Sequence, residues 1–407
     1  MSTSETQMER SAWMLPFGVT LIAMFCLQLS NLGFSPLLPS IQRDVDMSFT
    51  QLGLFTGVYG LLAMLLSVPA GISARRFGEK RVLALGLVGV AIGSVLLGQA
   101  WDFGSALAFR GLTIFGYRFA FVSVLIAVAL TAPPSLRGRT MGVLGATAAL
   151  ASVVGAPLGG ILVGEFGWRI AILGYAAMAL FGATVFWFFY RPTSPAAAGA
   201  VQPEPHADPM NRSAFRSPIV WMLALIVGLG GFGQFTVTYF VPSVAEAVYG
   251  LDAAAAGVII STGYLAAIVL NLGIGAVADR FNKLVVLGAI FVVLSAASAS
   301  LAIEHQLTFR IATATVIGFG FSAANQLYGL AGSVMPRKEA GHAVGVVSLG
   351  AGLFGFFGPQ MLGILRDVTG SFAAGFYMVA VADLLTLGLV VVLYRMTRRS
   401  RQKGTSQ

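Results

Sequence analysis

Several residue types on which whole classes of proteins depend are scarce in this sequence. Charged residues fill 10 % of the 407 positions and hydrophobic residues 57 %, whereas a soluble domain carries about 25 % charge. So few charges cannot solvate a protein surface, which excludes a water-soluble globular fold. The single cysteine, Cys26, cannot close a disulfide within the chain.

Motifs for metal binding, ATP hydrolysis and catalysis are also missing. The three histidines have no metal-like spacing, and there is no G-x-x-x-x-G-K-[ST] loop. No Ser/His/Asp set, carboxylate pair or metal cluster falls in one place. We therefore predict no enzymatic activity, no cofactor, no metal site and no ATP-driven pump.

Long apolar segments dominate the sequence. A helix that spans a bilayer needs about 20 mainly apolar residues. Twelve segments meet this length, at residues 14–35, 50–72, 82–101, 104–130, 140–163, 168–190, 218–241, 253–277, 283–302, 306–334, 341–365 and 372–394. The predicted fold class is an all-α membrane protein with twelve transmembrane helices.

One stretch without an apolar face divides these segments into two sets of six. Residues 191–216 are rich in proline and alanine, which predicts a flexible cytoplasmic linker. The predicted domains are a cytoplasmic tail at 1–13, a six-helix bundle at 14–190, the linker at 191–217, a second six-helix bundle at 218–394 and a basic tail at 395–407.

The positive charges predict the orientation. Nineteen lysines and arginines fall on one side of the segments, whereas Arg43, Arg169 and Arg366 fall on the other. The positive-inside rule then places both termini in the cytoplasm, and we expect a multi-pass protein of a bacterial inner (plasma) membrane. The formal charge of +9 is mostly this signal. We therefore predict a lipid bilayer around the chain, no nucleic-acid partner and no obligate protein partner.

The second half of the chain repeats the first in order and spacing. Gln28 stands eight residues before Pro36, and Gln234 stands eight residues before Pro242. Other elements return in the same order at offsets of 200 to 204 residues. An apolar chain built from two similar halves is typical of secondary transporters, whose working site lies between the repeats.

The loop after the second segment of each half carries a repeated motif. The first copy, residues 71–77, reads GISARRF, and the second, residues 275–281, reads GAVADRF. With two pseudo-symmetric six-helix bundles and a central cytoplasmic loop, these motifs resemble the major facilitator superfamily over about residues 14–394. The family's motif reads G-x-x-x-D-R-x-G-R-[KR], so Arg75 stands here where the family has an acid.

The resemblance implies a conformational latch at these loops. In the family the acid pairs with neighbouring helix ends and holds the outward-facing state, and Glu79 is a candidate substitute for it here. A basic loop that only sets topology would explain the charges but not the repeated glycine spacing. The predicted latch residues are Gly71, Arg75, Arg76, Gly78, Glu79 and Arg81 in the first half and Gly275, Asp279 and Arg280 in the second.

The fifth segment contains a motif rich in glycine and proline. Residues 155–160, GAPLGG, resemble the family's antiporter motif G-P-x-x-G-G with the proline one place late. Glycines let helices approach closely, and a proline kink needs a neighbour that covers the freed carbonyl. Small-residue packing alone would select similar residues, so the motif favours export only weakly. The predicted hinge residues are Gly155, Pro157, Gly159, Gly160, Gly358 and Pro359.

Arg118 lies deep in the fourth segment and has no counterpart in the repeat, where Gly318 stands. An arginine inside a bilayer costs about 3 kcal/mol even on the lower scales. The resemblance implies that helices 1, 4, 7 and 10 line the cavity, which makes Arg118 a candidate anion anchor. A guanidinium can hold an oxyanion through two parallel hydrogen bonds. The alternative is a structural arginine satisfied by backbone carbonyls.

Other polar side chains fall on the same four helices. Gln28 and Gln234 are related by the repeat, as expected for a site on the repeat axis. Asn325 and Gln326 point about 100° apart, so we expect only one of them to face the cavity. Any one of these residues could equally form a helix–helix hydrogen bond. The predicted substrate-binding residues are Arg118, Tyr117, Gln28, Asn31, Gln234, Tyr239, Asn325, Gln326 and Tyr328, with Tyr59 as a candidate gate.

Three further charges lie within the apolar segments. Arg110 and Arg310 are repeat-related and near the outer ends of their helices. They are either structural or, as the resemblance implies for the helix-4 arginine, linked to proton transfer. Asp383 is the only carboxylate well inside the predicted segments, and it is either a structural partner or a proton carrier.

The charges favour one function over its alternative. Deep positive charge, with no carboxylate in the first six segments, indicates transport of a small organic or inorganic anion. We predict rocker-switch alternating access, coupled to protons. The alternative is a proton-driven efflux pump for drugs or other lipophilic compounds, which the antiporter-like motif would favour.

Overall fold

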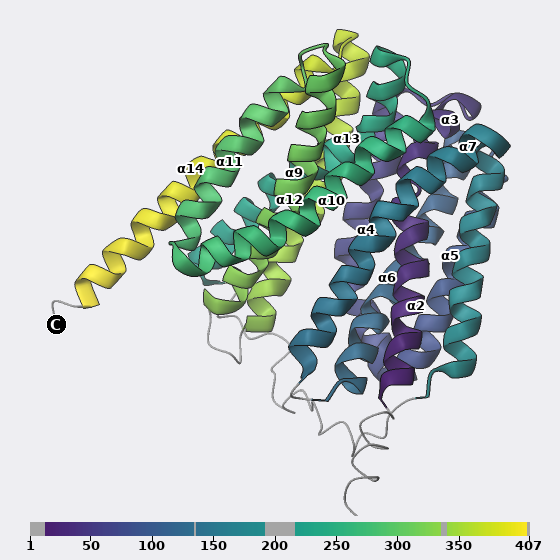
Figure 1. The fold of residues 1–407 in the computed structure, drawn as a ribbon, viewed down its shortest axis with the longest axis horizontal. Coiled ribbons are helices and arrows are strands. Elements are labelled where there is room, and N and C mark those ends of the chain that lie inside the picture. The colour runs from purple at the N-terminus through teal and green to yellow at the C-terminus, as the bar shows by residue number, and fades with distance from the viewer. Residues whose placement is uncertain (1–12, 134–135, 192–215, 335–339, 405–407) are drawn as a thin grey trace, which may run out of the picture. The chain divides into compact units, whose positions relative to one another are not determined.

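The computed structural model describes residues 13–133, 136–191, 216–334 and 340–404, and every regular element within them is a helix (Figure 1). The chain divides into two compact units. Unit 1 takes the described residues of Met1–Asp46, Leu65–His206 and Asp252–Gly257, and unit 2 takes those of Met47–Met64, Ala207–Leu251 and Val258–Gln407. The predicted division at the linker 191–217 stays a prediction, because most of that segment lies outside the described residues.

Unit 1 contains the helices of the first half. Prolines preset φ and lack an N–H, so Pro36 and Pro39 stand at the starts of two short helical elements. The first predicted segment is therefore followed by helix as far as Asp44. The bounds are α2 Met14–Leu32, η1 Ser35–Leu37, α3 Leu38–Asp44, α4 Phe49–Phe77, α5 Glu79–Leu97 and α6 Phe103–Thr131, with the first part of α4 belonging to unit 2.

The element α7, Arg137–Phe189, contains two of the predicted segments. Gly167 breaks the helix with φ 78, a conformation that glycine adopts without strain. The Tyr175 hydroxyl donates a hydrogen bond to the Gly155 carbonyl at 3.1 Å, although twenty residues of straight helix would span about 30 Å. The chain therefore folds back near Gly167, and both the fifth and the sixth predicted segments are present.

Helix α6, which carries Arg110 and Arg118, is anchored at its start and along one side. Asp102 accepts a hydrogen bond from the Ser105 N–H at 2.7 Å in a capping box, and hydrogen bonding to Ser105 holds the pKa of Asp102 below its ordinary value. Further along, Gly116 packs directly on α5. A Cβ there would lie 2.6 Å from the Gly86 carbonyl oxygen, so the two backbones approach as closely as only glycine allows.

Unit 2 contains most of the second half. Phe232, Val379 and Ala382 form a buried apolar cluster between α9 and α14. The bounds are α9 Pro218–Tyr249, α10 Ala253–Arg280, α11 Lys283–Ser300, α12 Gln306–Val334, α13 Ala340–Thr369 and α14 Ala373–Gly404. The first residues of α10 belong to unit 1.

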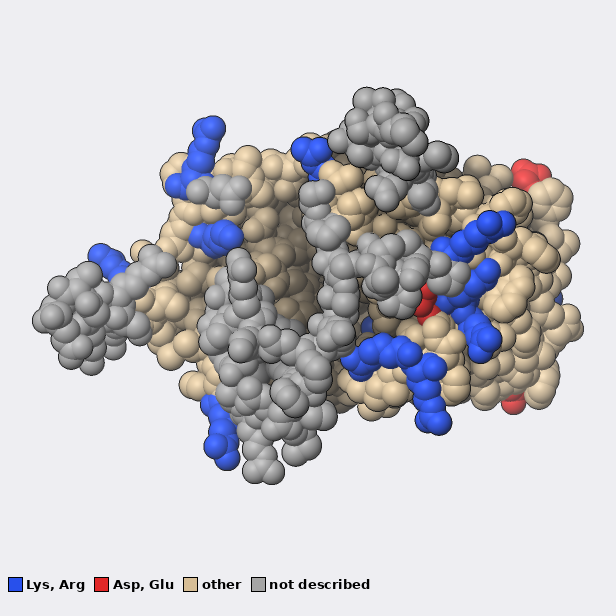
Figure 2. Space-filling model, turned by 90° about the horizontal axis from the view of Figure 1, so that it is seen from below, with Lys and Arg blue, Asp and Glu red and all other residues tan. Residues whose placement is uncertain are grey.

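The helices have the length and composition of membrane spans. Eleven of the described elements are long and apolar enough to cross a bilayer, and α7 counts once among them although it holds two segments. Figure 2 shows a face on which Lys and Arg clearly outnumber Asp and Glu. Such an excess of basic residues is typical of a cytoplasmic face.

Candidate functional site

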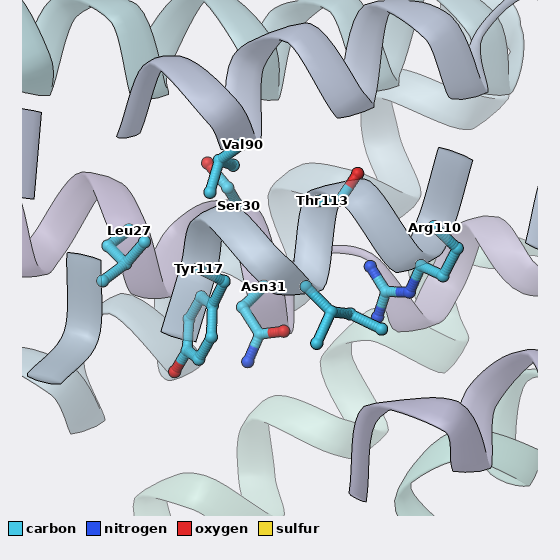
Figure 3. A pocket seen from close by; sticks show the side chains of 8 residues that line it. Leu27, Ser30, Asn31, Val90, Arg110, Thr113 and Tyr117 are labelled. Atoms are coloured by element: carbon cyan, nitrogen blue, oxygen red, sulfur yellow. The ribbon is translucent and has the colours of Figure 1, made fainter. Parts of the chain in front are cut away.

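A small cavity in unit 1 is bounded by α2, α5 and α6 (Figure 3). The α6 side chains that line it follow helix spacing, so they share one face of that helix. In the view of Figure 3, Asn31 of α2 lies between Tyr117 and Arg110 of α6. The lining residues are Leu27, Ser30, Asn31, Val90, Arg110, Thr113, Ile114 and Tyr117. The structure thus brings together three residues that were singled out from the sequence.

Arg110 supplies a buried positive charge to this cavity. The side chain is 2 % exposed, and its guanidinium carbon lies 3.9 Å from the centroid of the Phe34 ring. A ring face stabilises a cation through its quadrupole. The six apolar segments predicted in the first half contain no Asp or Glu.

Tyr117 and Gln28, two predicted substrate-binding residues, contact each other. The Tyr117 hydroxyl donates to Oε1 of Gln28 across α6 and α2. This hydrogen bond satisfies the polar end of a buried tyrosine. It also holds Gln28, which is half-buried, in one orientation.

Arg118 lies half-buried near the middle of α6, two turns beyond Arg110. Its Nη2 donates to Oγ of Ser67 on α4 at 2.7 Å, and its guanidinium carbon lies 5.6 Å from the ring centroid of Phe121. Ser67 was not predicted from the sequence, because a single serine in an apolar helix has no distinctive signature.

The predicted residues of unit 2 differ in exposure. Gln234 and Tyr239 of α9 are buried, and the Gln234 side chain packs where α12 has Gly320. Asn325 of α12 is exposed and donates from Nδ2 to Oδ1 of Asn271 on α10 at 3.0 Å. Asn271 is a second residue that was not predicted from the sequence.

The remaining predicted members of the substrate-binding set are half-buried. Gln326, one residue after the exposed Asn325, is half-buried, and which of the two faces the cavity stays a prediction. Tyr328 and Tyr59 are also half-buried, and Tyr59 belongs to the part of α4 that groups with unit 2. Their roles stay predictions.

The two remaining in-membrane charges have different surroundings. Asp383 of α14 is 2 % exposed and accepts a hydrogen bond at 2.9 Å from the hydroxyl of Ser298 on α11, a partner that was likewise not predicted. Gly233 of α9 faces the same carboxylate. Arg310 is exposed, unlike its repeat partner Arg110.

The predicted latch of the first half lies at the junction of α4 and α5. Gly78 takes φ 87 between the two helices. Glu79 accepts a hydrogen bond from the hydroxyl of Tyr190 at 3.1 Å, whereas Arg75 and Arg76 are exposed. Arg81 and Arg280 are likewise exposed, Gly71 and Gly275 are half-buried, and the side chain of Asp279 lies outside the described residues. The latch stays a prediction.

The predicted hinge residues stand where helices make close contacts. Gly155 and Gly159 of α7 lie against Gly33, whose carbonyl accepts a hydrogen bond from Tyr175 at 3.0 Å. Gly160 lies against the backbone of Ala253. In unit 2, Gly358 has no room for a side chain beside Phe232 and Thr236, and the backbone of Pro359 meets Gly53 of α4; Pro157 and Pro359 both stand inside their helices.

The comparisons with known proteins agree with this architecture. The family model described as Major Facilitator Superfamily matches residues 20–359 and 249–407. A putative tartrate transporter of Agrobacterium vitis is 24 % identical over 417 residues, covering 96 % of this chain and 92 % of its own length. A probable nitrate transporter, NarT, of Staphylococcus epidermidis is 24 % identical over 373 residues, covering 90 % of this chain and 93 % of its own.

A solved structure shares the fold at low sequence identity. It is a bacterial homologue of the human lysosomal transporter Spinster, in an inward-facing and occupied conformation, with a TM-score of 0.77 and 16 % identity. The alignment covers 94 % of this chain and 96 % of that one. Because the family model matches most of the sequence and the helices are those of a multi-pass membrane protein, the chain belongs to the Major Facilitator Superfamily of transporters.

Proposed function

We propose that the protein is a secondary active transporter of a small anionic solute, organic or inorganic, which works by alternating access and is coupled to protons. Both termini face the cytoplasm of a bacterial cell and the helices cross its inner membrane. The excess of Lys and Arg on one side of the segments supports this orientation.

The observation that carries the proposal is the positive charge inside unit 1. Arg110 is buried beside a small cavity that is lined by both polar and apolar side chains, and Arg118 lies half-buried two turns further along α6. No carboxylate occurs in the apolar segments of this half. Charges inside a membrane domain face the bundle interior or a water-filled path and mark the route of an ion or substrate. Positive charges in that position favour an anion.

The relatives support the same class of solute. Two proteins that align over most of this chain carry names that refer to tartrate and to nitrate. Both solutes are small anions with several acceptor oxygens, which a guanidinium can bind through two parallel hydrogen bonds. At 24 % identity the relatives indicate the class rather than the particular solute.

Ligand-induced stabilisation of the purified protein tests the proposal. A ligand at 100 times its Kd raises the free energy of unfolding by about 2.7 kcal/mol, which a thermal melt detects. We expect nitrate, tartrate or a related anion to stabilise the wild type. Arg118→Ala should lose this response, and Arg118→Lys should keep only part of it because an ammonium cannot form the paired hydrogen bonds.

The control variant is Arg139→Ala, which removes an exposed arginine of the same unit. It should respond to the anion as the wild type does. Stabilisation by lipophilic compounds alone, equal in wild type and Arg118→Ala, would contradict the proposal and support a drug efflux pump. Uptake of the stabilising anion into proteoliposomes, driven by a pH gradient, then tests transport and proton coupling together.

A further inference from the structure

Each repeat has a polar contact between its second and fourth helices. In unit 1, Arg118 of α6 donates from Nη2 to Oγ of Ser67 on α4 at 2.7 Å. In unit 2, Asn325 of α12 donates from Nδ2 to Oδ1 of Asn271 on α10 at 3.0 Å. In both cases the donor is on the fourth helix of its half and the acceptor is on the second.

The two acceptors are related by the repeat. Ser67 and Asn271 both stand eighteen residues after the first residue of their helix. The donors come from one face of the equivalent helices, because Asn325 follows Gly318, the counterpart of Arg118, by seven residues or nearly two turns. Both halves therefore have a hydrogen bond between the second and the fourth helix, formed by different side chains.

The exposure of these residues indicates that the two hydrogen bonds do more than hold neighbouring helices together. Such a hydrogen bond belongs in the interior of a bundle, where it joins packed helices. Asn325 is exposed instead, and Asn271, Ser67 and Arg118 are half-buried. Ser67 lies ten residues, and Asn271 nine residues, before the last residue of its helix. This spacing corresponds to about 15 Å along the helix axis. Polar side chains at such depth belong on a surface that lines a water-filled path rather than lipid.

The donors suit an anion with several oxygens. A guanidinium carries five N–H groups in a fixed plane, and an amide carries two. A hydrogen bond to a neighbouring helix restricts the rotation of each donor group before any solute arrives. Binding to a side chain that is already held costs less conformational freedom than binding to a mobile one.

We propose that Ser67 and Asn271 are positioning residues for the solute, Ser67 by holding the guanidinium of Arg118 and Asn271 by holding the amide of Asn325. Each unit thereby presents prearranged N–H donors to a carboxylate or another anion with two or more acceptor oxygens. Chloride, a single atom of the same charge as nitrate, gains little from such an arrangement. This inference rests on the proposed function, and it assigns residues that determine the choice among anions.

Uptake kinetics in proteoliposomes test the inference, with nitrate and tartrate as solutes and chloride as competitor. Ser67→Ala and Asn271→Ala should each raise KM by about tenfold at most, the value of one hydrogen bond, while kcat and the melting temperature of the empty protein stay near wild type. Competition by chloride should become more effective in both variants. Ser67→Thr, which keeps the hydroxyl, should restore the wild-type KM.

Matched controls remove hydroxyls from the same two helices. Ser73→Ala in α4 and Thr262→Ala in α10 should leave KM and chloride competition unchanged; the Thr262 hydroxyl donates only within its own helix, to the Ile259 carbonyl. A double-mutant cycle adds a second measure. Once Arg118 has been changed to Lys, removing the Ser67 hydroxyl should have less effect than it has in the wild type.

The outcomes separate this inference from the proposed function. If Arg118→Ala abolishes the response to anions but Ser67→Ala and Asn271→Ala bind them as the wild type does, the positioning role is wrong and the proposed function stands. The same conclusion follows if either alanine variant has a lower melting temperature than the wild type but the same KM. A hydrogen bond that only stabilises the packing of two helices would give this result. If the wild type neither binds nor transports an anion, both the positioning role and the proposed function are wrong.

Discussion

Buried charges give each unit its chemical character at the scale of single residues. Arg110 is buried against the Phe34 ring in unit 1, and Asp383 is buried beside the Ser298 hydroxyl in unit 2. A buried ionised group is costly unless it is paired. A carboxyl group that carries a proton avoids most of that cost and still accepts the serine hydrogen bond, which makes Asp383 a candidate proton carrier for the proposed proton coupling.

Substitutions at Asp383 test this residue for proton coupling. Asn has the shape of a protonated carboxyl group and can accept the Ser298 hydrogen bond, so Asp383→Asn should fold and melt near wild type. We expect it to exchange solute across proteoliposome membranes but to lose the accompanying proton movement, measured with a dye that reports the internal pH.

Asp383→Ala provides the structural comparison. It leaves the buried Ser298 hydroxyl without the acceptor it has now, and this loss should lower the free energy of unfolding by about 1–3 kcal/mol. Proton movement that persists unchanged in Asp383→Asn would show that the carboxyl group is a structural partner only.

The sequence was sufficient to single out charged candidates for the site but not their hydrogen-bond partners. Arg118 and Asp383 stand out because a charge in a long apolar segment is rare. Ser67, Asn271 and Ser298 do not, because serine and asparagine are ordinary in such segments and their contacts depend on how neighbouring helices are rotated. Rotation is set by side-chain packing along the whole interface, which periodicity in one helix does not report.

At the scale of elements, hydropathy predicted the membrane-spanning part of each helix better than its ends. The segment predicted at 218–241 belongs to a helix that continues to Tyr249, and the one at 372–394 to a helix that continues to Gly404. Helices end where capping or a break in conformation stops them, such as Gly250 with φ 62 after α9. Those positions need not coincide with the edge of the apolar stretch.

Close packing of α5 on α6 can be tested by adding single methyl groups. A Cβ at Gly116 would lie 2.5 Å from the Val90 nitrogen, so Gly116→Ala should separate the helices and lower the free energy of unfolding by about 1–3 kcal/mol. Tyr117 and Arg118 follow directly, so KM for the solute should also rise. Thermal melts and uptake kinetics measure the two effects.

Gly142→Ala in α7 is the matched control for this prediction. Nothing lies within 4 Å of a Cβ at Gly142. In an exposed helix position, alanine stabilises the helix by up to about 1 kcal/mol relative to glycine. The control should therefore melt at the wild-type temperature or above it. Equal behaviour of the two variants would mean that α5 and α6 are not held together by this contact.

At the scale of the whole molecule, the repeat in the sequence predicted the architecture, but it did not predict the environment of each repeated residue. Twelve segments were expected and the described helices contain them, two within α7. Arg110 and Arg310 occupy equivalent places, yet one is buried and the other exposed. Equivalent positions in the two repeats therefore share their place along a helix but not their exposure.

The position of Arg118 has an electrical consequence. A full elementary charge that crosses a membrane at 100 mV changes in energy by about 2.3 kcal/mol, and Arg118 stands fifteen residues into a helix of 29, near the middle of that field. A bound monovalent anion cancels its charge, so voltage acts differently on the empty carrier and on the loaded one. Net uptake requires the empty carrier to return across the membrane, whereas solute exchange does not. The rate of net uptake should therefore vary more steeply with an imposed potassium diffusion potential than the rate of exchange. Equal voltage dependence of the two processes would mean that the guanidinium does not move within the field.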